Sequence, residues 1–196
     1  MILPKFFCLF DTEFTAWENS QENNWSKPGE KKELIQMAVF KIKNLNNKLE
    51  KIDKMNIYVK PKYNPILSEY IIKLTGITDK KINELGLDFD TSILKLYNFC
   101  KHEGNLINVY SYGGDYEIIK ENLQYNNYLK SHFLYDWNKN HYDLVPLLKN
   151  ENIPTEKYTS GTLYKHFYSN IKSDVHNAEW DVKSLLLSLN KIMNKL

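Results

Sequence analysis

Residues 6–15 read FFCLFDTEFT, in which five apolar residues lead directly into Asp11 and Glu13. The apolar run predicts a buried strand over about residues 5–15. Because side chains alternate along a strand, both carboxylates point to the same face of it. Two such charges about 5 Å apart repel each other by roughly 3 kcal/mol at an effective dielectric constant of about 20. Either a divalent cation or solvent at a strand end relieves that repulsion, so the pair alone leaves both interpretations open.

The rest of the chain alternates apolar runs with helical patterns and predicts one mixed α/β domain over residues 1–196. Ser68 and Gly76 are typical N-cap and C-cap residues for the first expected helix. Further strands are expected at 33–42, 55–61, 105–112 and 132–137, with a turn near 43–50. Helices are expected at 68–76, 89–104, from Asp115 onward, and at 143–151, 159–168 and 176–194.

The composition is that of an ordinary globular protein, with 42% hydrophobic and 26% charged residues. No apolar run approaches the roughly 18 residues that a membrane-spanning helix needs, and the first residues lack the pattern of a signal peptide. We therefore expect a cytoplasmic protein that has no membrane partner. Cys8 and Cys100 each lie in an apolar run, which favours two buried thiols over a disulfide or a metal pair.

All 26 basic residues are lysines, and the chain contains no arginine. Contacts with phosphate groups therefore depend on lysine ammonium groups, backbone N–H groups or metal ions, because the bidentate guanidinium contact is absent. The net charge of +2 neither requires nor excludes a nucleic-acid partner.

Three other polar residues stand at positions that suggest chemistry. Asp115 follows an expected strand and a Gly-Gly turn, at the strand edge where α/β folds gather ligands. An aspartate there also serves as a helix N-cap. His176 lies at or before the start of the last helix, and Asp181 opens the apolar face of that helix. A surface histidine and a first-turn aspartate that favours the helix dipole would give the same pattern.

Taken together, FDTEFT, YGGDYE and HNAEWD resemble, in this order, the three motifs of the DEDDh 3′–5′ exonucleases. That family has the ribonuclease H-like fold, so the resemblance implies an α/β protein with a mixed five-stranded sheet flanked by helices. LSEYIIKLTGIT also looks like the family's stretch between the third strand and the second motif. DTEFTAWEN, followed by ELIQMAVFKI, looks most like the branch of histone-mRNA-trimming exonucleases and their bacterial relatives.

The resemblance implies hydrolysis of phosphodiester bonds at a 3′ end with two Mg²⁺ or Mn²⁺ ions, releasing nucleoside 5′-monophosphates. On the family's pattern, Asp11, Glu13 and Asp181 bind the metal that carries the nucleophilic water, and Asp11 and Asp115 hold the second metal. Two metals about 4 Å apart can stabilise both the attacking and the leaving oxygen, and oxygen ligands suit these ions. His176 is the implied general base, a role that suits the ordinary imidazole pKa of about 6.5.

The residues that follow the first motif correspond to family positions that contact the terminal nucleotide, so Phe14, Thr15 and Trp17 are candidates for substrate binding. An aromatic ring can stack on a base for about 1–3 kcal/mol, although core packing explains Phe14 and Trp17 equally well. The polar loop 17–33 is long enough to form a flap over the 3′ end. Candidates for steering the phosphate backbone, with a solvated face as the alternative, are Lys31, Lys32, Lys80 and Lys81.

Three alternatives stay open. FDTEFT comes close to the first motif of haloacid-dehalogenase-like phosphatases, but Glu13 replaces a second aspartate, and Ile119 interrupts the later GDxxxD pattern. A non-catalytic nucleic-acid-binding module on the same fold is the second, although all five catalytic-type residues are retained. A subunit that needs a partner protein is the third. The expected ligand is a single-stranded 3′ end. The resemblance leans toward RNA, but a protein distinguishes RNA from DNA by contacts to the 2′-hydroxyl, which the sequence does not reveal.

Overall fold

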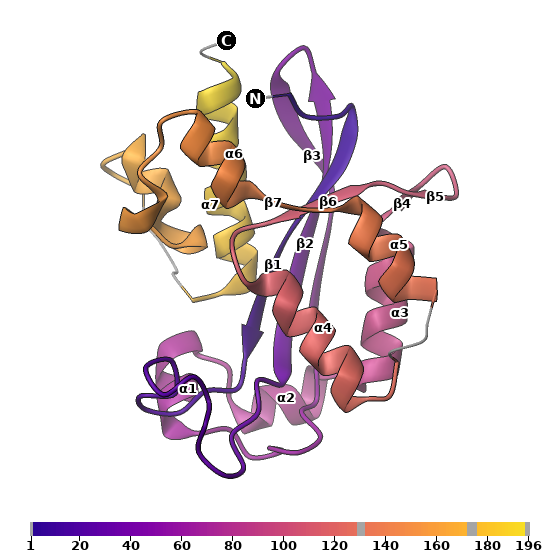
Figure 1. The fold of residues 1–196 in the computed structure, drawn as a ribbon, viewed down its shortest axis with the longest axis vertical. Coiled ribbons are helices and arrows are strands. Elements are labelled where there is room, and N and C mark those ends of the chain that lie inside the picture. Colours follow the sequence, from indigo (N-terminus) through magenta and orange to yellow (C-terminus); the bar gives the residue numbers. More distant parts are fainter. Residues whose placement is uncertain (1, 129–131, 172–175, 195–196) are drawn as a thin grey trace.

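The computed structural model describes residues 2–128, 132–171 and 176–194. At its centre lies a mixed five-stranded sheet in the order β3-β2-β1-β6-β7, with helices on both faces (Figure 1). This architecture confirms the predicted α/β class. The strands of the sheet are β1 (Phe6–Phe14), β2 (Leu34–Leu45), β3 (Lys48–Tyr58), β6 (Asn108–Ser111) and β7 (His141–Asp143). The other elements are α1 (Glu69–Thr75), α2 (Asp79–Leu85), α3 (Phe89–Phe99), β4 (Lys101–His102), β5 (Asn105–Leu106), α4 (Asp115–Tyr125), α5 (His132–Asn140), α6 (Leu144–Asn150), η1 (Thr155–Lys157), η2 (Ser160–His166) and α7 (Ala178–Met193).

Strands β1, β2 and β3 form an antiparallel meander, while β6 runs parallel to β1 and β7 runs parallel to β6. The β2–β3 hairpin turns at Asn46 and Asn47, which have φ angles of 50° and 69°. Asparagine tolerates this left-handed region better than most residues. The tight turn lets β3 begin at Lys48, whereas the apolar pattern predicted a strand only from residue 55.

The period of two along β1 divides its side chains between two hydrophobic cores. Phe7 and Leu9 pack in the core that also contains Val182 and Leu185 of α7. Cys8 and Phe10 point to the opposite face, where the core includes residues of α3 and α4. The next residues continue this alternation, so the strand directs Asp11 and Glu13 toward the face that α7 covers and Thr12 toward the other.

The prediction of a strand at 132–137 is wrong. Those residues belong to helix α5, and the fifth strand is β7, which pairs with β6 through Val109↔His141 and the two following positions. A short apolar run does not distinguish a buried strand from a buried helix, and Trp137 of α5 is fully buried against Phe10. Strand β7 has only three residues, His-Tyr-Asp, which carry no apolar alternation that sequence reasoning could detect.

Several boundaries also differ from the prediction. The expected helix 89–104 ends at Phe99. The expected strand 105–112 is divided into two strands: β5, which pairs with β4 in a small hairpin, and β6. Residues 159–168, expected to be an α-helix, form the 3-10 helix η2. Helix α1 agrees with the prediction, because Ser68 accepts the Ile71 N–H and Gly76 has a φ of 69° at the C-cap.

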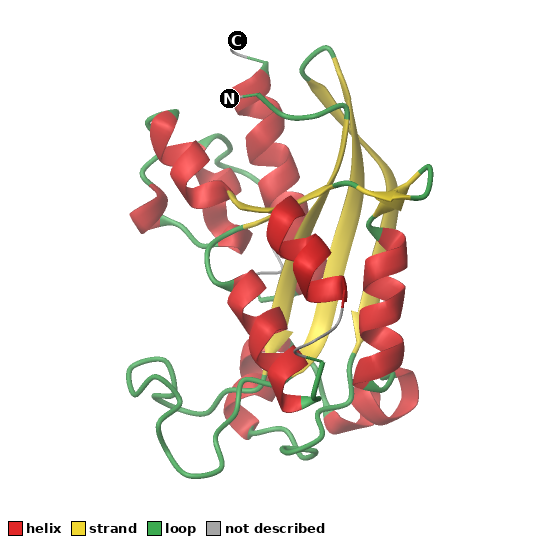
Figure 2. Ribbon diagram, turned by 45° about the vertical axis from the view of Figure 1, so that its right-hand side comes forward, coloured by secondary structure: helices red, strands yellow, loops and turns green. Residues whose placement is uncertain are grey.

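Both cysteines are free and buried, as expected, and burial together with the Cys8 thiol raises the pKa of the Cys100 thiol. Within the described residues, no helix has the length and apolar character needed to cross a membrane. The loop after β1 is a prominent irregular segment at the lower edge of the molecule (Figure 2).

Candidate active site

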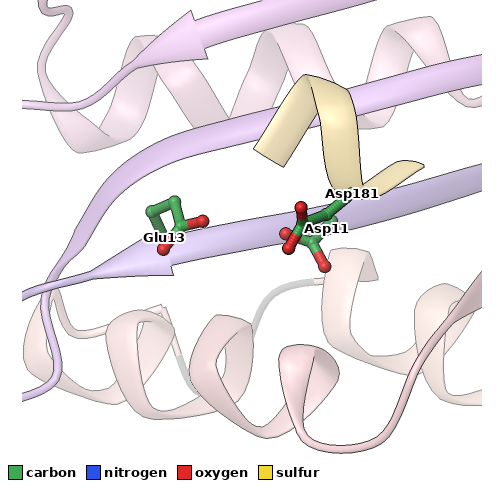
Figure 3. Close-up of side chains that lie close together, drawn as sticks. All are labelled: Asp11, Glu13 and Asp181. Atoms are coloured by element: carbon green, nitrogen blue, oxygen red, sulfur yellow. The ribbon is translucent and has the colours of Figure 1, made fainter. Parts of the chain in front are cut away.

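Asp11 and Glu13 lie on β1 and face Asp181, which is in the first turn of α7. All three side chains are buried, and each offers a carboxylate oxygen within 4.8 Å of the others. The carboxylates of Asp11 and Asp181 approach each other directly, while Glu13 approaches from farther along the strand (Figure 3). Strand alternation therefore brings two acids to one side of the sheet, and α7 supplies the third across the core.

Asp115 reaches the same region from the other face of β1. Its Oδ1 accepts the backbone N–H of Thr12 at 3.0 Å and the Thr12 hydroxyl at 2.7 Å. Strand β6 pairs with β1 from Phe7 to Leu9. The Asp115 side chain bonds to β1 at Thr12, beyond these paired residues. Asp115 is the first residue of α4. The N-cap residue is Gly114, which has no side chain to bond to the first turn of this helix. Its carboxylate bonds to the strand, in contrast to the capping role that an aspartate at a helix start often has.

The four carboxylates strongly disfavour one another's charge. Burial raises the pKa of Glu13 to about 8, with further contributions from Asp181 and Asp115. Burial also raises the pKa of Asp115 to about 7, although its bonds to Thr12 oppose the shift. The pKa of Asp11 is raised by burial and by the other three carboxylates. Desolvation and like charges therefore act together, an arrangement characteristic of functional sites.

The 3-10 helix η2 completes the surroundings of Asp181; sequence reasoning expected a helix here but missed its contact with Asp181. The Ser160 hydroxyl donates to Asp181 Oδ2 at 3.2 Å. A Cβ atom at Gly161 would collide with the Asp181 carboxylate, so only glycine permits this close approach. The indole N–H of Trp180 donates to the Gly161 carbonyl at 3.1 Å and fixes η2 against α7. The only sequence signal was a glycine within an expected helix.

His176 precedes α7, whose N-cap is Asn177, so it stands before the helix start as the sequence suggested. Its backbone has a φ of 66°, in the left-handed region that few non-glycine residues adopt. The imidazole is half-buried, and desolvation lowers its pKa. A neutral imidazole can accept a proton, which is what a general base requires.

All five of these residues line one pocket of about 580 Å³. Its walls come from the end of β1, the loop after it, α1, the start of α4 and the segment 158–160. Four acids and a histidine from separate parts of the sequence therefore line one cavity: Asp11, Glu13, Asp115, His176 and Asp181.

The sequence model of a protein family described as Exonuclease (RNase_T) matches residues 8–189 of the chain. The chain belongs to this exonuclease family. It is therefore a nuclease and a hydrolase. The match removes the phosphatase alternative, and it favours an enzyme over a non-catalytic binding module. No curated protein matches the sequence significantly.

Solved structures share the fold of this exonuclease. Cell-death related nuclease 4 (CRN-4) aligns with a TM-score of 0.74 at 19% identity, over 97% of this chain and 64% of that one. The exonuclease thus spans less than two thirds of the CRN-4 chain. The nuclease domain of 3′hExo, a DEDDh family member, aligns with a TM-score of 0.69 at 18% identity, over 97% and 92% of the two chains. E. coli exonuclease I aligns with a TM-score of 0.67 at 13% identity, over 98% and 43%. These matches confirm the ribonuclease H-like fold.

The acidic cluster of the exonuclease fits divalent cations. Members of the family generally use divalent metals. Here Asp11, Glu13 and Asp181 each offer a carboxylate oxygen within 4.8 Å of the others, close enough for one cation to contact all three. The charged groups that shift the pKa of Asp11 are all carboxylates, so the cluster has an excess of negative charge. Oxygen donors and uncompensated negative charge are what Mg²⁺ or Mn²⁺ sites offer.

Of the three residues expected to bind substrate, Phe14 and Trp17 line the pocket, but Thr15 does not. Thr15 is buried; its hydroxyl donates to the Lys31 carbonyl and accepts the Glu33 N–H. Its carbonyl accepts the indole N–H of Trp25 at 3.1 Å. The side chain of Thr15 thus holds the loop 17–33 together and is not directed at the cavity.

The loop 17–33 forms part of the pocket wall, because Gln21, Trp25 and Lys32 line the cavity. Trp25 packs against Phe14 with ring centroids 5.6 Å apart. The buried side chain of Asn122 donates to the Lys32 carbonyl at 2.7 Å and accepts the Leu34 N–H at 3.0 Å. These contacts, which sequence reasoning missed, attach the end of the loop to α4.

Proposed function

We propose that this chain is a 3′–5′ exonuclease that removes nucleoside 5′-monophosphates one at a time from single-stranded nucleic acid. One exonuclease domain comprises residues 1–196, consistent with the family match over residues 8–189. The observation that carries the proposal is the convergence of four carboxylates and one half-buried histidine on a single pocket. No structural requirement of the sheet accounts for four buried acids around one pocket, whereas phosphodiester hydrolysis with divalent cations does.

Asp11, Glu13 and Asp181 would hold one divalent cation, Mg²⁺ or Mn²⁺, and Asp11 and Asp115 would hold a second. Bound there, the cations would supply positive charge to the scissile phosphate. In other enzymes arginine side chains can do this, but this chain contains no arginine. The bonds from Thr12 fix the orientation of the Asp115 carboxylate. Ser160 and Gly161 do the same for Asp181.

His176 takes the proton from the attacking water. Burial lowers its pKa, so the imidazole is neutral and able to accept a proton around neutral pH. His176 lines the same pocket as the four carboxylates, so the proton acceptor and the proposed cation ligands share one cavity.

We infer that the ligand is an unpaired 3′ end, because the acids are buried in the pocket and a terminal nucleotide must leave its partner strand to reach them. Phe14 and Trp17 line the cavity and offer aromatic faces on which the terminal base can stack. Base stacking does not read sequence, so we expect little preference among bases. In the structural neighbours, 3′hExo is bound to rAMP and exonuclease I to a dA16 oligonucleotide. The motif resemblance leans toward RNA, and the assay described next compares RNA with DNA directly.

The test uses purified protein and 5′-labelled single-stranded RNA and DNA oligonucleotides, with Mg²⁺, Mn²⁺ or EDTA. We expect a ladder that shortens from the 3′ end, disappears in EDTA, and is lost in the Asp11→Ala and His176→Ala variants. Glu84→Gln on the exposed face of α2 is the matched control and should degrade the oligonucleotides like the wild type.

Unchanged cleavage in both active-site variants would identify a contaminating nuclease and contradict the site assignment. Absence of a ladder on either polymer, with cation binding intact, would instead favour a subunit that acts only with a partner protein. Release of the labelled 5′-terminal nucleotide as the first product would contradict the proposed polarity.

A further inference from the structure

One face of α4 leads away from the active-site pocket. Glu117, Glu121 and Tyr125 are four residues apart, so they lie along the same face of the helix. Glu117 lines the pocket, whereas Tyr125 is the last residue of α4, about 12 Å farther along the helix axis. Figure 1 shows α4 running from the centre of the molecule toward the loops at its lower edge.

Lysine side chains and aromatic rings surround this face of α4. The Lys32 ammonium lies 3.2 Å from Glu121 Oε1 and 4.8 Å from the centre of a Trp25 ring. The Tyr125 hydroxyl donates to the other oxygen of Glu121 at 3.2 Å. Because Lys32 and Trp25 also line the pocket, this surface is continuous with the active site.

Tyr63 extends the same surface beyond the pocket. It is 44% exposed, and its ring meets the ring of Tyr125 edge-on with centroids 6.2 Å apart. The Tyr63 hydroxyl donates to the Tyr125 carbonyl at 3.1 Å. The Lys31 ammonium lies 3.4 Å from the centre of the Tyr63 ring, and the Lys62 ammonium lies 5.7 Å from it. Two ammonium groups thus lie near one exposed aromatic ring.

A buried carboxylate fixes the backbone that carries Tyr63. Glu33 is 4% exposed, and its Oε1 accepts the N–H groups of Lys62 and Tyr63 at 2.7 and 2.8 Å. Its Oε2 accepts the N–H of Asn64 at 2.6 Å. Hydrogen bonds to an ionised group are among the strong ones in proteins. The position of the ring is therefore set before any ligand binds, which lowers the entropic cost of binding.

We propose that Tyr63, Lys31 and Lys62 form a second binding surface for single-stranded polynucleotide, occupied by nucleotides about three or four positions from the 3′ end. The inference rests on the proposed function, which puts the 3′ end in the pocket. A stacked strand carries one phosphate about every 3.4 Å, so about 12 Å along α4 corresponds to three or four nucleotides. The two ammonium groups attract phosphates that the active-site carboxylates repel, and the Tyr63 ring offers a base-stacking face.

Binding of a 12-nucleotide, 5′-fluorescein-labelled oligoadenylate to the full chain in EDTA tests the surface. Tyr63→Ala should weaken binding about 5- to 160-fold, the range of one base stack. Tyr63→Phe keeps the ring and loses only the bond to the Tyr125 carbonyl, so its affinity should stay within about twofold of the wild type. The Lys31→Ala/Lys62→Ala double variant should reduce the slope of log affinity against log salt by about 1.4, or about 0.7 for each phosphate contact.

Lys101→Ala is the matched control, because Lys101 also lies over a tyrosine ring, that of Tyr97, at 4.2 Å. It should leave both the affinity and the salt slope unchanged. Hydrolysis of the p-nitrophenyl ester of thymidine 5′-monophosphate, which reaches only the pocket, tests the proposed function separately. Tyr63→Ala should lower kcat/KM on the oligonucleotide by the same factor as the affinity and leave the ester rate within about twofold.

Equal losses on the ester and the oligonucleotide in Tyr63→Ala would overturn the second surface, because the residue would then act on the structure of the pocket. A Tyr63→Phe variant as weak as Tyr63→Ala would overturn it too, since the hydrogen bond would account for the effect. If the wild type hydrolyses neither substrate, the proposed function fails, and the binding measurements in EDTA still decide whether the surface exists.

Discussion

Replacing Glu13 with glutamine should stabilise the cation-free protein while abolishing its activity. Glutamine has nearly the same shape as glutamic acid but never carries a charge. Glu13 is 8% exposed and adjoins Asp11 and Asp181, so its ionised form is disfavoured by both burial and repulsion. The variant removes this source of instability together with one ligand of the proposed cation site.

The magnitude follows from the pKa of Glu13, about 8 in the folded chain against 4.5 for the free side chain. A carboxyl group whose folded pKa is raised stabilises the fold below its unfolded pKa and loses that contribution as the pH rises toward the folded pKa. From pH 4.5 to about pH 7.5, three pH units at about 1.36 kcal/mol each give about 4 kcal/mol. The Tm of a chain of this size changes by about 2–4 °C per kcal/mol, so Glu13→Gln should raise Tm by up to about 8–16 °C near pH 7.5.

Thermal unfolding in EDTA, followed by circular dichroism from about pH 4.5 to 8, measures the effect. The Tm difference between Glu13→Gln and the wild type should be near zero at the acidic end and grow with pH. Adding Mg²⁺ should stabilise the wild type and narrow the difference. Glu22→Gln, at an exposed position of the loop, is the control and should follow the wild type at every pH. A Glu13→Gln variant that is no more stable than the wild type near pH 7.5, or equally more stable at all pH values, would refute the reasoning.

Three further variants test other parts of the site. Gly161→Ala must displace the Asp181 carboxylate, so kcat/KM should fall about 100-fold while circular dichroism shows a retained fold; wild-type kinetics would contradict the close approach. Asn122→Ala leaves the backbone partners of the loop unsatisfied and should lower the free energy of unfolding in urea by about 1–3 kcal/mol, with a higher KM; an unchanged urea midpoint would contradict this. His176→Ala should lower kcat about 10²- to 10⁴-fold while leaving the Mg²⁺-induced change in Tm intact, and loss of that change would make it a ligand and not a base.

Much of the site could be predicted because the period of two is a local property of β1. The apolar positions that identify the strand also determine which face Asp11 and Glu13 occupy, before any partner is known. Asp115 and Asp181 could be placed for a similar reason, since each stands where an apolar pattern begins or ends. Their convergence on one pocket, however, depends on the crossing of α4 and α7 over the sheet, which the family resemblance supplied and the pattern alone did not.

The parts that could not be predicted are those whose conformation depends on tertiary contacts. Strand β7 exists because β6 offers it an edge to pair with, and its three polar or aromatic residues show no preference of their own. The 3-10 helix η2 is bonded to α7 through Trp180, Ser184 and Asp181. An α-helix over the same residues would match the sequence pattern equally well. Non-local bonds of this kind override local propensity.

The first half of β1 stabilises the fold, and its second half carries two acids of the candidate site. Phe7, Leu9 and Phe10 are fully buried and supply apolar contacts, while the residues after them introduce buried charge that the fold must tolerate. At roughly 1.5–3 kcal/mol for a fully buried large apolar side chain, the three together contribute about 4.5–9 kcal/mol, which exceeds the roughly 4 kcal/mol that the ionised Glu13 costs near pH 7.5. Cations in the pocket would remove most of that cost, so loading with metal should both activate the exonuclease and make it harder to unfold.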